Sequence, residues 1–333
     1  MRPRGATRRR CSGGRFIDTP VPLSYLWSMP MMLRSTLALS IAALAAAGCS
    51  DSTEPTDTVS RQLYYIASSP GTYPYTLSIP RLFGSALDGS APVSVIPDSV
   101  LALHPIYVGF PPWISLNGKQ IKVQSGDSIL TVDPFGRVLS IVPYPDSVPG
   151  YPGPALSPDG TTFAWFSRGF LNLSEVEGGG WTRIYFDSLG PVLALPAWSR
   201  DGRSLAYVSY FTSQITGQPQ DIRVWTRRFS DGFAMPVATL DVVPGSLAWS
   251  QDGRWLTVGF DGEIHRLRTD GTGPIQVVFY GSTTWWPSSS AWGPRDSLLA
   301  IVSGDRLLVM HPDGTAARLV AAGGGLWFAS WRN

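Results

Sequence analysis

The chain has 333 residues, with 35 Gly, 29 Pro and 12% aromatic residues, whereas only 15% of the residues are charged. This composition is typical of many short strands joined by tight turns, so we expect an all-β fold rather than long amphipathic helices. Although the formal net charge is +2, seven of the 26 Lys and Arg precede Cys49, and from Cys49 onward acidic residues outnumber basic ones by four, which argues against nucleic acid as a partner.

The first 31 residues fit no signal peptide, because a leader of this length containing Pro3, Pro20 and Pro22 is atypical. We interpret residues 1–31 as an upstream extension that results from a start codon placed too early. A twin-arginine signal at Arg8–Arg10 is the alternative, but the apolar run that it needs does not follow directly.

Residues 32–48 have the features of a signal peptide. Arg34 supplies a positive charge, Leu37–Ala47 is an apolar run too short to span a bilayer, and a small residue precedes Cys49. The segment from Leu44 to Cys49 resembles a bacterial lipobox, which implies that Cys49 is acylated and becomes the first residue of the mature protein. An ordinary signal peptide with an incidental cysteine is the alternative.

Residues 49–60 form a polar segment that we interpret as a tether. The pair Ser50 and Asp51 is not an obvious inner-membrane retention signal, so we expect lipid anchoring at Cys49 in the outer membrane, facing the periplasm or the cell surface. The other cysteine, Cys11, also precedes the region that is predicted to fold. A disulfide between the two cysteines would therefore not stabilise the domain, so its stability must come from its hydrophobic core.

A repeat follows the tether. The segment Ala197–Val208 recurs as Ala248–Val258 and as Ala155–Trp165, and more loosely from Trp113 and from Ala291. One position of this motif, the serine slot, recurs at steps of 42, 42, 51 and 43 residues, and a further step of 39 reaches a truncated sixth copy; the slots are Ser115, Ser157, Ser199, Ser250, Gly293 and Arg332. The repeat length is therefore about 42 residues.

A second pattern lies between the copies: two apolar strands joined by an Asp-Gly turn, as at Asp88-Gly89, Asp231-Gly232, Asp270-Gly271 and Asp313-Gly314. Each repeat thus contains two hairpins. A four-stranded sheet of this kind cannot bury both faces alone and must stack on its neighbours around an axis. We predict that residues 61–333 form an all-β, six-bladed β-propeller with four antiparallel strands per blade.

The truncated sixth copy ends at Asn333, and its continuation is at the start of the domain, where Arg61–Ile66 matches Arg203–Val208. We therefore predict that the N- and C-terminal strands pair within one blade and close the ring, which removes free sheet edges.

These motifs resemble the TolB-type, WD-like propeller repeat, whose consensus is Trp-Ser-Pro-Asp-Gly-Arg followed by an apolar strand. The resemblance covers residues 61–333 and implies the fold more than a function, since relatives range from interaction modules to non-catalytic domains of peptidases and to sugar lyases. TolB proteins carry an extra N-terminal domain, whereas only about a dozen tether residues follow Cys49 here. The envelope role of TolB is therefore not carried over.

No pattern in the sequence identifies a catalytic, cofactor or metal site. The Asp-Gly pairs lack the further acids of a calcium loop and are typical of hairpin turns. The histidines, His104, His265 and His311, are far apart, and the repeat register places the last two away from the axis, which disfavours a metal-dependent lyase or lactonase. Nucleophile-elbow, phosphate-loop and dinucleotide patterns are missing from the sequence. These observations leave open whether the protein is an enzyme, and we favour a protein without catalytic activity.

Unusual loops, including an insertion near residues 210–220, should open on one face of the propeller, and they carry aromatic residues. The predicted ligand face consists of Tyr107, Phe110, Tyr144, Tyr151, Tyr210, Phe211, Trp285 and Trp286, with Tyr73 and Tyr75 nearby. Exposed aromatics suit a protein hot spot or the stacking of sugar rings. The alternative is that they pack onto the loops and plug the channel. The opposite face, with the Asp-Gly turns, should be small and polar.

We therefore expect a monomeric envelope lipoprotein that binds or scaffolds a protein or a glycan, needs no cofactor and does not bind nucleic acid. Two alternatives remain: a lyase or lactonase with polar residues in the axial channel, and a purely structural envelope component.

Overall fold

The computed structural model describes residues 61–67, 80–90, 92–107, 111–144, 154–167, 169–177, 180–185, 192–260, 262–281, 288–323 and 325–332. The chain divides after Asp57, and all of these residues lie in the second part. The expected signal peptide, Cys49 and the tether lie outside the described residues. Within the described ranges, helices are too short and too polar to cross a bilayer.

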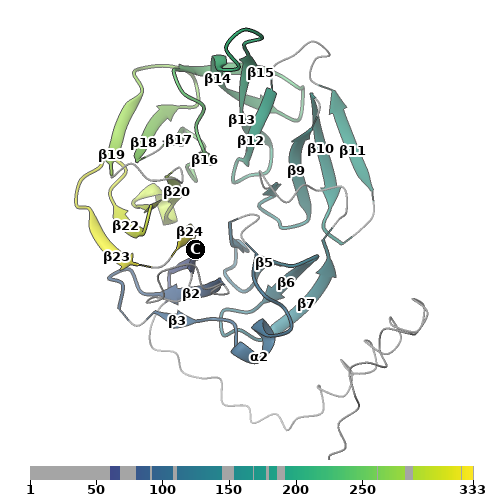
Figure 1. The fold of residues 1–333 in the computed structure, drawn as a ribbon, viewed down its shortest axis with the longest axis vertical. Coiled ribbons are helices and arrows are strands. Elements are labelled where there is room, and N and C mark those ends of the chain that lie inside the picture. Colours follow the sequence, from purple (N-terminus) through teal and green to yellow (C-terminus); the bar gives the residue numbers. More distant parts are fainter. Residues whose placement is uncertain are drawn as a thin grey trace, which may run out of the picture. The chain divides into compact units, whose positions relative to one another are not determined.

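Six four-stranded antiparallel sheets form a ring, as predicted (Figure 1). Blade I contains β24 (Leu326–Trp331), β1 (Leu63–Ala67), β2 (Arg81–Ser85) and β3 (Val93–Ser94). Blade II contains β4 (Trp113–Ile114), β5 (Ile121–Ser125), β6 (Ser128–Val132) and β7 (Val138–Pro143). Blade III contains β8 (Ala155–Leu156), β9 (Thr162–Ser167), β10 (Phe170–Glu175) and β11 (Trp181–Tyr185).

Blade IV contains β12 (Val192–Trp198), β13 (Ser204–Thr212), β14 (Pro219–Arg228) and β15 (Ala234–Leu240). Blade V contains β16 (Ser246–Trp249), β17 (Trp255–Phe260), β18 (Glu263–Arg268) and β19 (Gln276–Tyr280). Blade VI contains β20 (Ser289–Trp292), β21 (Leu299–Ser303), β22 (Arg306–Met310) and β23 (Arg318–Ala322). Two helical turns, α2 (Asp98–Leu101) and η3 (Pro294–Asp296), complete the described elements. The first strand in each blade is the innermost, next to the axis (Figure 1).

In four of the six blades the second strand is the most buried, because neighbouring blades cover both of its faces; in blade II the third strand, β6, is more buried than β5. All five residues of β1 and all five of β21 are buried. Hydrophobic clusters cross the blade boundaries: Ala206 and Val208 of blade IV, for example, pack in one cluster with Leu256 and Val258 of blade V. The core is therefore distributed around the ring between successive sheets.

The termini close the ring in blade I, which confirms the prediction. The innermost strand β24 pairs with β1, with Leu63 opposite Trp331. The amide of Arg332 donates a 2.8 Å hydrogen bond to the carbonyl of Gln62, just as Ser199 donates to Ser204 at 2.9 Å in blade IV. The sixth copy of the motif is thus completed by the N-terminal segment, and the backbone hydrogen bond of the repeat is preserved.

The serine slot has a structural role in the first hairpin of the blade. The buried Ser199 hydroxyl donates to the Asp201 carboxylate at 2.6 Å and accepts from the amide of Ser204 at 2.9 Å. Asp201 also accepts from the amide of Arg203, and Gly202 has a φ of 69°. The same bonds recur at Ser115 (with an Asn in place of the Asp), Ser157 and Ser250. These aspartates act as turn residues, which supports the interpretation made from the sequence.

Motif tryptophans link successive blades. The indole nitrogen of Trp198 donates to the carbonyl of Ala155 at 3.1 Å, Trp249 donates to Ala197 at 2.9 Å, and Trp331 donates to Ala291 at 2.8 Å. In each case the acceptor lies on the inner strand of the preceding blade. Each tryptophan therefore fills space between two sheets and pairs a polar backbone group there.

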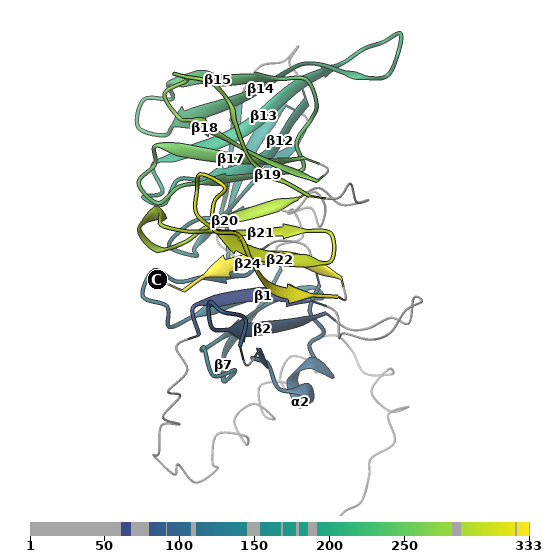
Figure 2. The ribbon, with the colours of Figure 1, turned by 90° about the vertical axis from the view of Figure 1, so that its left-hand side faces the viewer.

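The longest repeat step corresponds to an extended hairpin. Strands β13 and β14 have nine and ten residues, and the hairpin between them projects beyond its neighbours (Figure 2). The insertion predicted near residues 210–220 is therefore a continuation of two strands.

Candidate functional site

The two ends of the ring differ in what they carry. On one end, which we call the loop face, lie the hairpins between second and third strands and the connections from each fourth strand to the next blade. On the other end, the turn face, lie the Asp-Gly turns and the serine-slot turns. Every residue of the predicted ligand face that the structure describes lies on the loop face.

Two of these residues are exposed. Tyr107 precedes β4, its amide donates to the carbonyl of Gln124 at 3.0 Å, and 53% of its surface is accessible. Phe211 lies near the end of β13 and is 45% accessible. Both rings are therefore free to contact a partner.

Two others are half-buried and contribute to packing. Tyr144 forms a tilted contact with Phe163, with ring centroids 5.5 Å apart, and burial raises the pKa of its hydroxyl. Tyr210 packs against the cluster between blades IV and V. The packing alternative therefore describes Tyr144 and Tyr210 better than ligand contact does. Phe110, Tyr151, Trp285 and Trp286 lie outside the described residues, as do Tyr73 and Tyr75.

The structure adds exposed apolar side chains that the search for aromatics missed. Ile215, in the β13–β14 hairpin, is 95% accessible, and Tyr280, at the end of β19, is 72% accessible. Leu103 and Val242 are also exposed, in connections between blades. Tyr280 is the last residue of β19, and Ile215 and Val242 closely follow β13 and β15, so a strand end on the loop face is the signal that would have found these three; Leu103 follows α2 instead.

The axial channel contains a cavity of about 340 Å³ lined by the inner strands. Its serines are bound to protein groups: Ser246 donates to the carbonyl of Ser288 at 2.7 Å, and Ser290 donates to the Thr257 hydroxyl at 2.8 Å. Among the described residues, the lining of this cavity contains no Asp, Glu or His. The described wall thus offers no pair of groups for acid–base catalysis.

His265 and His311 lie where the repeat register predicts. His265 is on β18, the third strand of blade V, and its ring nitrogen is 2.6 Å from a Glu263 carboxylate oxygen. His311 lies in the β22–β23 turn and contacts the Thr315 hydroxyl. In the described part of the chain, no three His, Cys, Asp or Glu residues come together in a way that would hold a metal ion.

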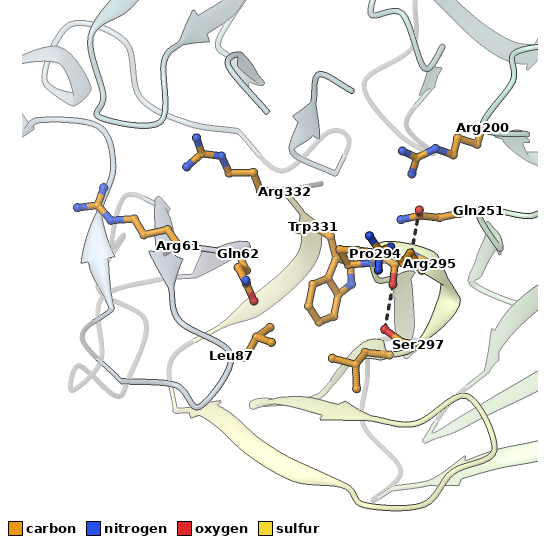
Figure 3. Close-up of a pocket in the computed structure, with 11 residues that line it drawn as sticks. Arg61, Gln62, Leu87, Arg200, Gln251, Pro294, Arg295, Ser297, Trp331 and Arg332 are labelled. Atoms are coloured by element: carbon orange, nitrogen blue, oxygen red, sulfur yellow. Dashed lines mark hydrogen bonds between the residues drawn. The ribbon is translucent and has the colours of Figure 1, made fainter. Parts of the chain in front are cut away.

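The turn face departs from the expectation of a small polar surface. A pocket of about 650 Å³ lies beside the axis and is lined by four arginines, Arg61, Arg200, Arg295 and Arg332 (Figure 3). They come from blades I, IV and VI, and the described lining includes no Asp or Glu. The motif predicts a small polar turn at each serine slot on this face. Two of the slots hold Gly293 and Arg332 instead of a serine, and Arg332 was the sequence signal that could have indicated the pocket.

No protein-family model and no curated protein matches the chain. Among solved structures, TolB from Acinetobacter baumannii is 18% identical, with a TM-score of 0.57 over 89% of this chain and 71% of that one. The putative TolB from Agrobacterium tumefaciens is 15% identical, with a TM-score of 0.52 over 81% of this chain and 98% of that one. This likeness concerns the architecture, and the chain has the fold of a TolB-type six-bladed β-propeller.

Proposed function

We propose that the protein is a binding or scaffolding propeller of the cell envelope that holds a protein or glycan partner on its loop face. One observation carries this proposal: exposed apolar side chains on the loop face are spread over several blades, namely Leu103, Tyr107, Phe211, Ile215, Val242 and Tyr280. The turn face also exposes Leu116, Phe135 and Phe233, but the four most exposed large apolar side chains among the described residues, Ile215, Leu103, Tyr280 and Val242, belong to the hairpins and connections of the loop face. Exposed apolar groups spread over several blades favour a partner that covers them.

The alternative of a lyase or lactonase in the axial channel has less support. The cavity there is lined by motif tryptophans, small and apolar residues, Arg200 and Gln251, and its Ser246 and Ser290 are bound to protein groups. A purely structural role remains as the outcome in which neither face binds anything.

The binding test compares aromatic residues of similar exposure on the two faces. We expect the double variant Tyr107→Ala/Phe211→Ala to lose a partner that the wild type captures from native envelope extracts or from a glycan array. The matched control is Phe135→Ala/Phe233→Ala, because these rings are equally exposed on the turn face. Equal capture by the wild type and both variants would contradict the proposal, and so would equal loss in both variants.

The tryptophans of the proposed face need their own variants. We expect Trp285→Ala/Trp286→Ala to stay folded and to lose the partner. A large loss of stability with retained affinity would mean that these rings only fill space.

The envelope location rests on the leader, with Cys49 as the proposed lipid attachment site. A radioactive fatty acid should label the wild type and not Cys49→Ser. Equal labelling of the two chains would contradict the lipid anchor while leaving the binding proposal standing.

A further inference from the structure

A second cavity lies away from the axis, between the outer strands of blades IV and V, and we call it the rim groove. Its volume is about 670 Å³, which suits a ligand of metabolite size. Its described lining comes from the ends of β15 and β17, from the connection that follows β15, and from β18 and β19 with the residue before it. Strands β15 and β18 lie side by side there (Figure 2).

The walls of the rim groove are mostly apolar. Leu240, Val243 and Phe260 belong to the hydrophobic cluster between the two blades and form the floor. Ile275 and Val277 are partly exposed and form the outer wall. The groove is therefore an open continuation of the core, where the apolar part of a ligand would be removed from water.

Strand alternation explains why β18 lines this groove with polar side chains. Glu263, His265 and Leu267 point to one face of β18, because they are spaced two residues apart. Leu267 packs in the cluster between blades IV and V, whereas Ile264, on the other face, packs with blade VI. Glu263 and His265 therefore face blade IV, beyond the point at which the two blades close.

The charged groups of the rim groove are acidic. Its described lining includes Asp241 and Glu263 and contains no Lys or Arg. The Glu263 carboxylate uses one oxygen, Oε2, to contact His265 Nε2 at 2.6 Å. Asp241 is exposed, and within the described part of the chain it forms no ion pair. Arg223, on the neighbouring strand β14, binds Asp221 at 2.8 Å instead. The groove therefore favours a ligand that carries a positive charge.

The acidic and apolar parts are arranged along the groove. Glu263 is the first residue of β18, next to the loop face, and Asp241 follows the end of β15 at the same face. Val277 pairs with His265, and Ile275 precedes β19, so both lie farther from the loop face. A ligand that fits this order has a charged end and an apolar body.

We propose that the rim groove binds a small organic cation, an amine with an apolar body. The ammonium group lies between Asp241 and Glu263, and the apolar body lies against Val277. This site does not rest on the proposed function, because Tyr107 and Phe211 do not line it.

Ligand-observed NMR titration of the purified full chain at low salt tests the proposal. The probes share one body and differ in charge: phenylbutylamine, phenylbutanol and phenylbutanoate. We expect saturable binding of the amine, which added salt weakens, and at least about fivefold weaker binding of the alcohol. The carboxylate should not bind. Equal affinity for the amine and the carboxylate, or absence of saturable amine binding, would overturn the proposal.

Variants locate the site. Asp241→Asn/Glu263→Gln should weaken the amine at least about fivefold and leave the alcohol within twofold of the wild type. Val277→Lys, a change at a partly exposed position, should weaken the amine by at least the same factor. The matched control is Asp305→Asn, because Asp305 is exposed in the corresponding hairpin of blade VI and does not line the groove.

We expect the control to bind the amine within twofold of the wild type. An equal effect of Asp305→Asn and Asp241→Asn/Glu263→Gln would overturn the proposal, because the preference for the amine would then be a diffuse surface effect. Light scattering adds a separate check: a dimer that Val277→Lys dissociates would mean that a second copy of the chain fills the groove, which would also overturn the proposal.

Discussion

Closure of the ring by the C-terminal strand can be tested at Trp331. This side chain is 6% exposed, packs in the cluster between blades I and VI, and donates its indole N–H to Ala291. Replacing such a buried tryptophan by Ala costs about 3–5 kcal/mol. Because a domain has a total stability of about 5–15 kcal/mol, the loss is a large part of it. We expect Trp331→Ala to lower the melting temperature by roughly 6–20 °C.

Trp198→Ala is the matched control, since Trp198 makes the same inter-blade hydrogen bond inside the ring. If the last strand closes the ring, the two variants are destabilised to a similar degree. Deleting residues 327–333 should do more, because β1 loses its inner neighbour and its amides lose protection from hydrogen exchange. A melting temperature unchanged by Trp331→Ala, together with β1 amides still protected in the deletion variant, would refute the closure.

Three further predictions concern the turns. Ser199→Ala should cost about 1–3 kcal/mol in urea denaturation, because it removes two hydrogen bonds of the buried hydroxyl, one to the exposed Asp201 carboxylate and one from the half-buried Ser204 amide, each worth about 0.5–1.5 kcal/mol; a cost near zero would contradict this role. The hydrogen bond from Ser199 lowers the pKa of Asp201, so its stabilisation is present above about pH 4 and is lost as the pH falls through the folded-state pKa; Ser199→Ala should weaken this acid dependence of the melting temperature. Gly160→Ala places a Cβ 2.6 Å from the Trp113 ring and should destabilise the fold more than Gly253→Ala, where φ is similar and the space is empty; equal melting temperatures would show that the ring moves aside.

Much of the architecture could be predicted from the sequence because the repeat is local. The spacing of the serine slots predicts the six blades, and the match between Arg61–Ile66 and Arg203–Val208 predicts which strand pairs with β24. Both predictions depend on short segments in which the same turn residues and the same alternation of apolar and polar residues recur. Backbone hydrogen bonds between the strands then fix the register.

The arginine pocket could not be predicted in the same way. Its lining comes from segments as far apart in sequence as Arg61 and Arg332, and only the ring brings them together. The strand register likewise places Tyr144 and Tyr210 on the loop face without showing that their rings turn toward the core, because a loop position does not determine the direction of a side chain.

The pairing of β24 with β1 also sets an order of events during synthesis. Strand β1 is among the first segments of the domain to leave the ribosome, and its inner partner is the last, some 260 residues later. Until then both the inner edge of β1 and the open side of blade VI stay uncovered, and a prematurely terminated chain keeps them so. A chain that stops before β24 therefore leaves these two surfaces available to proteases and chaperones, whereas a chain translated through β24 covers them.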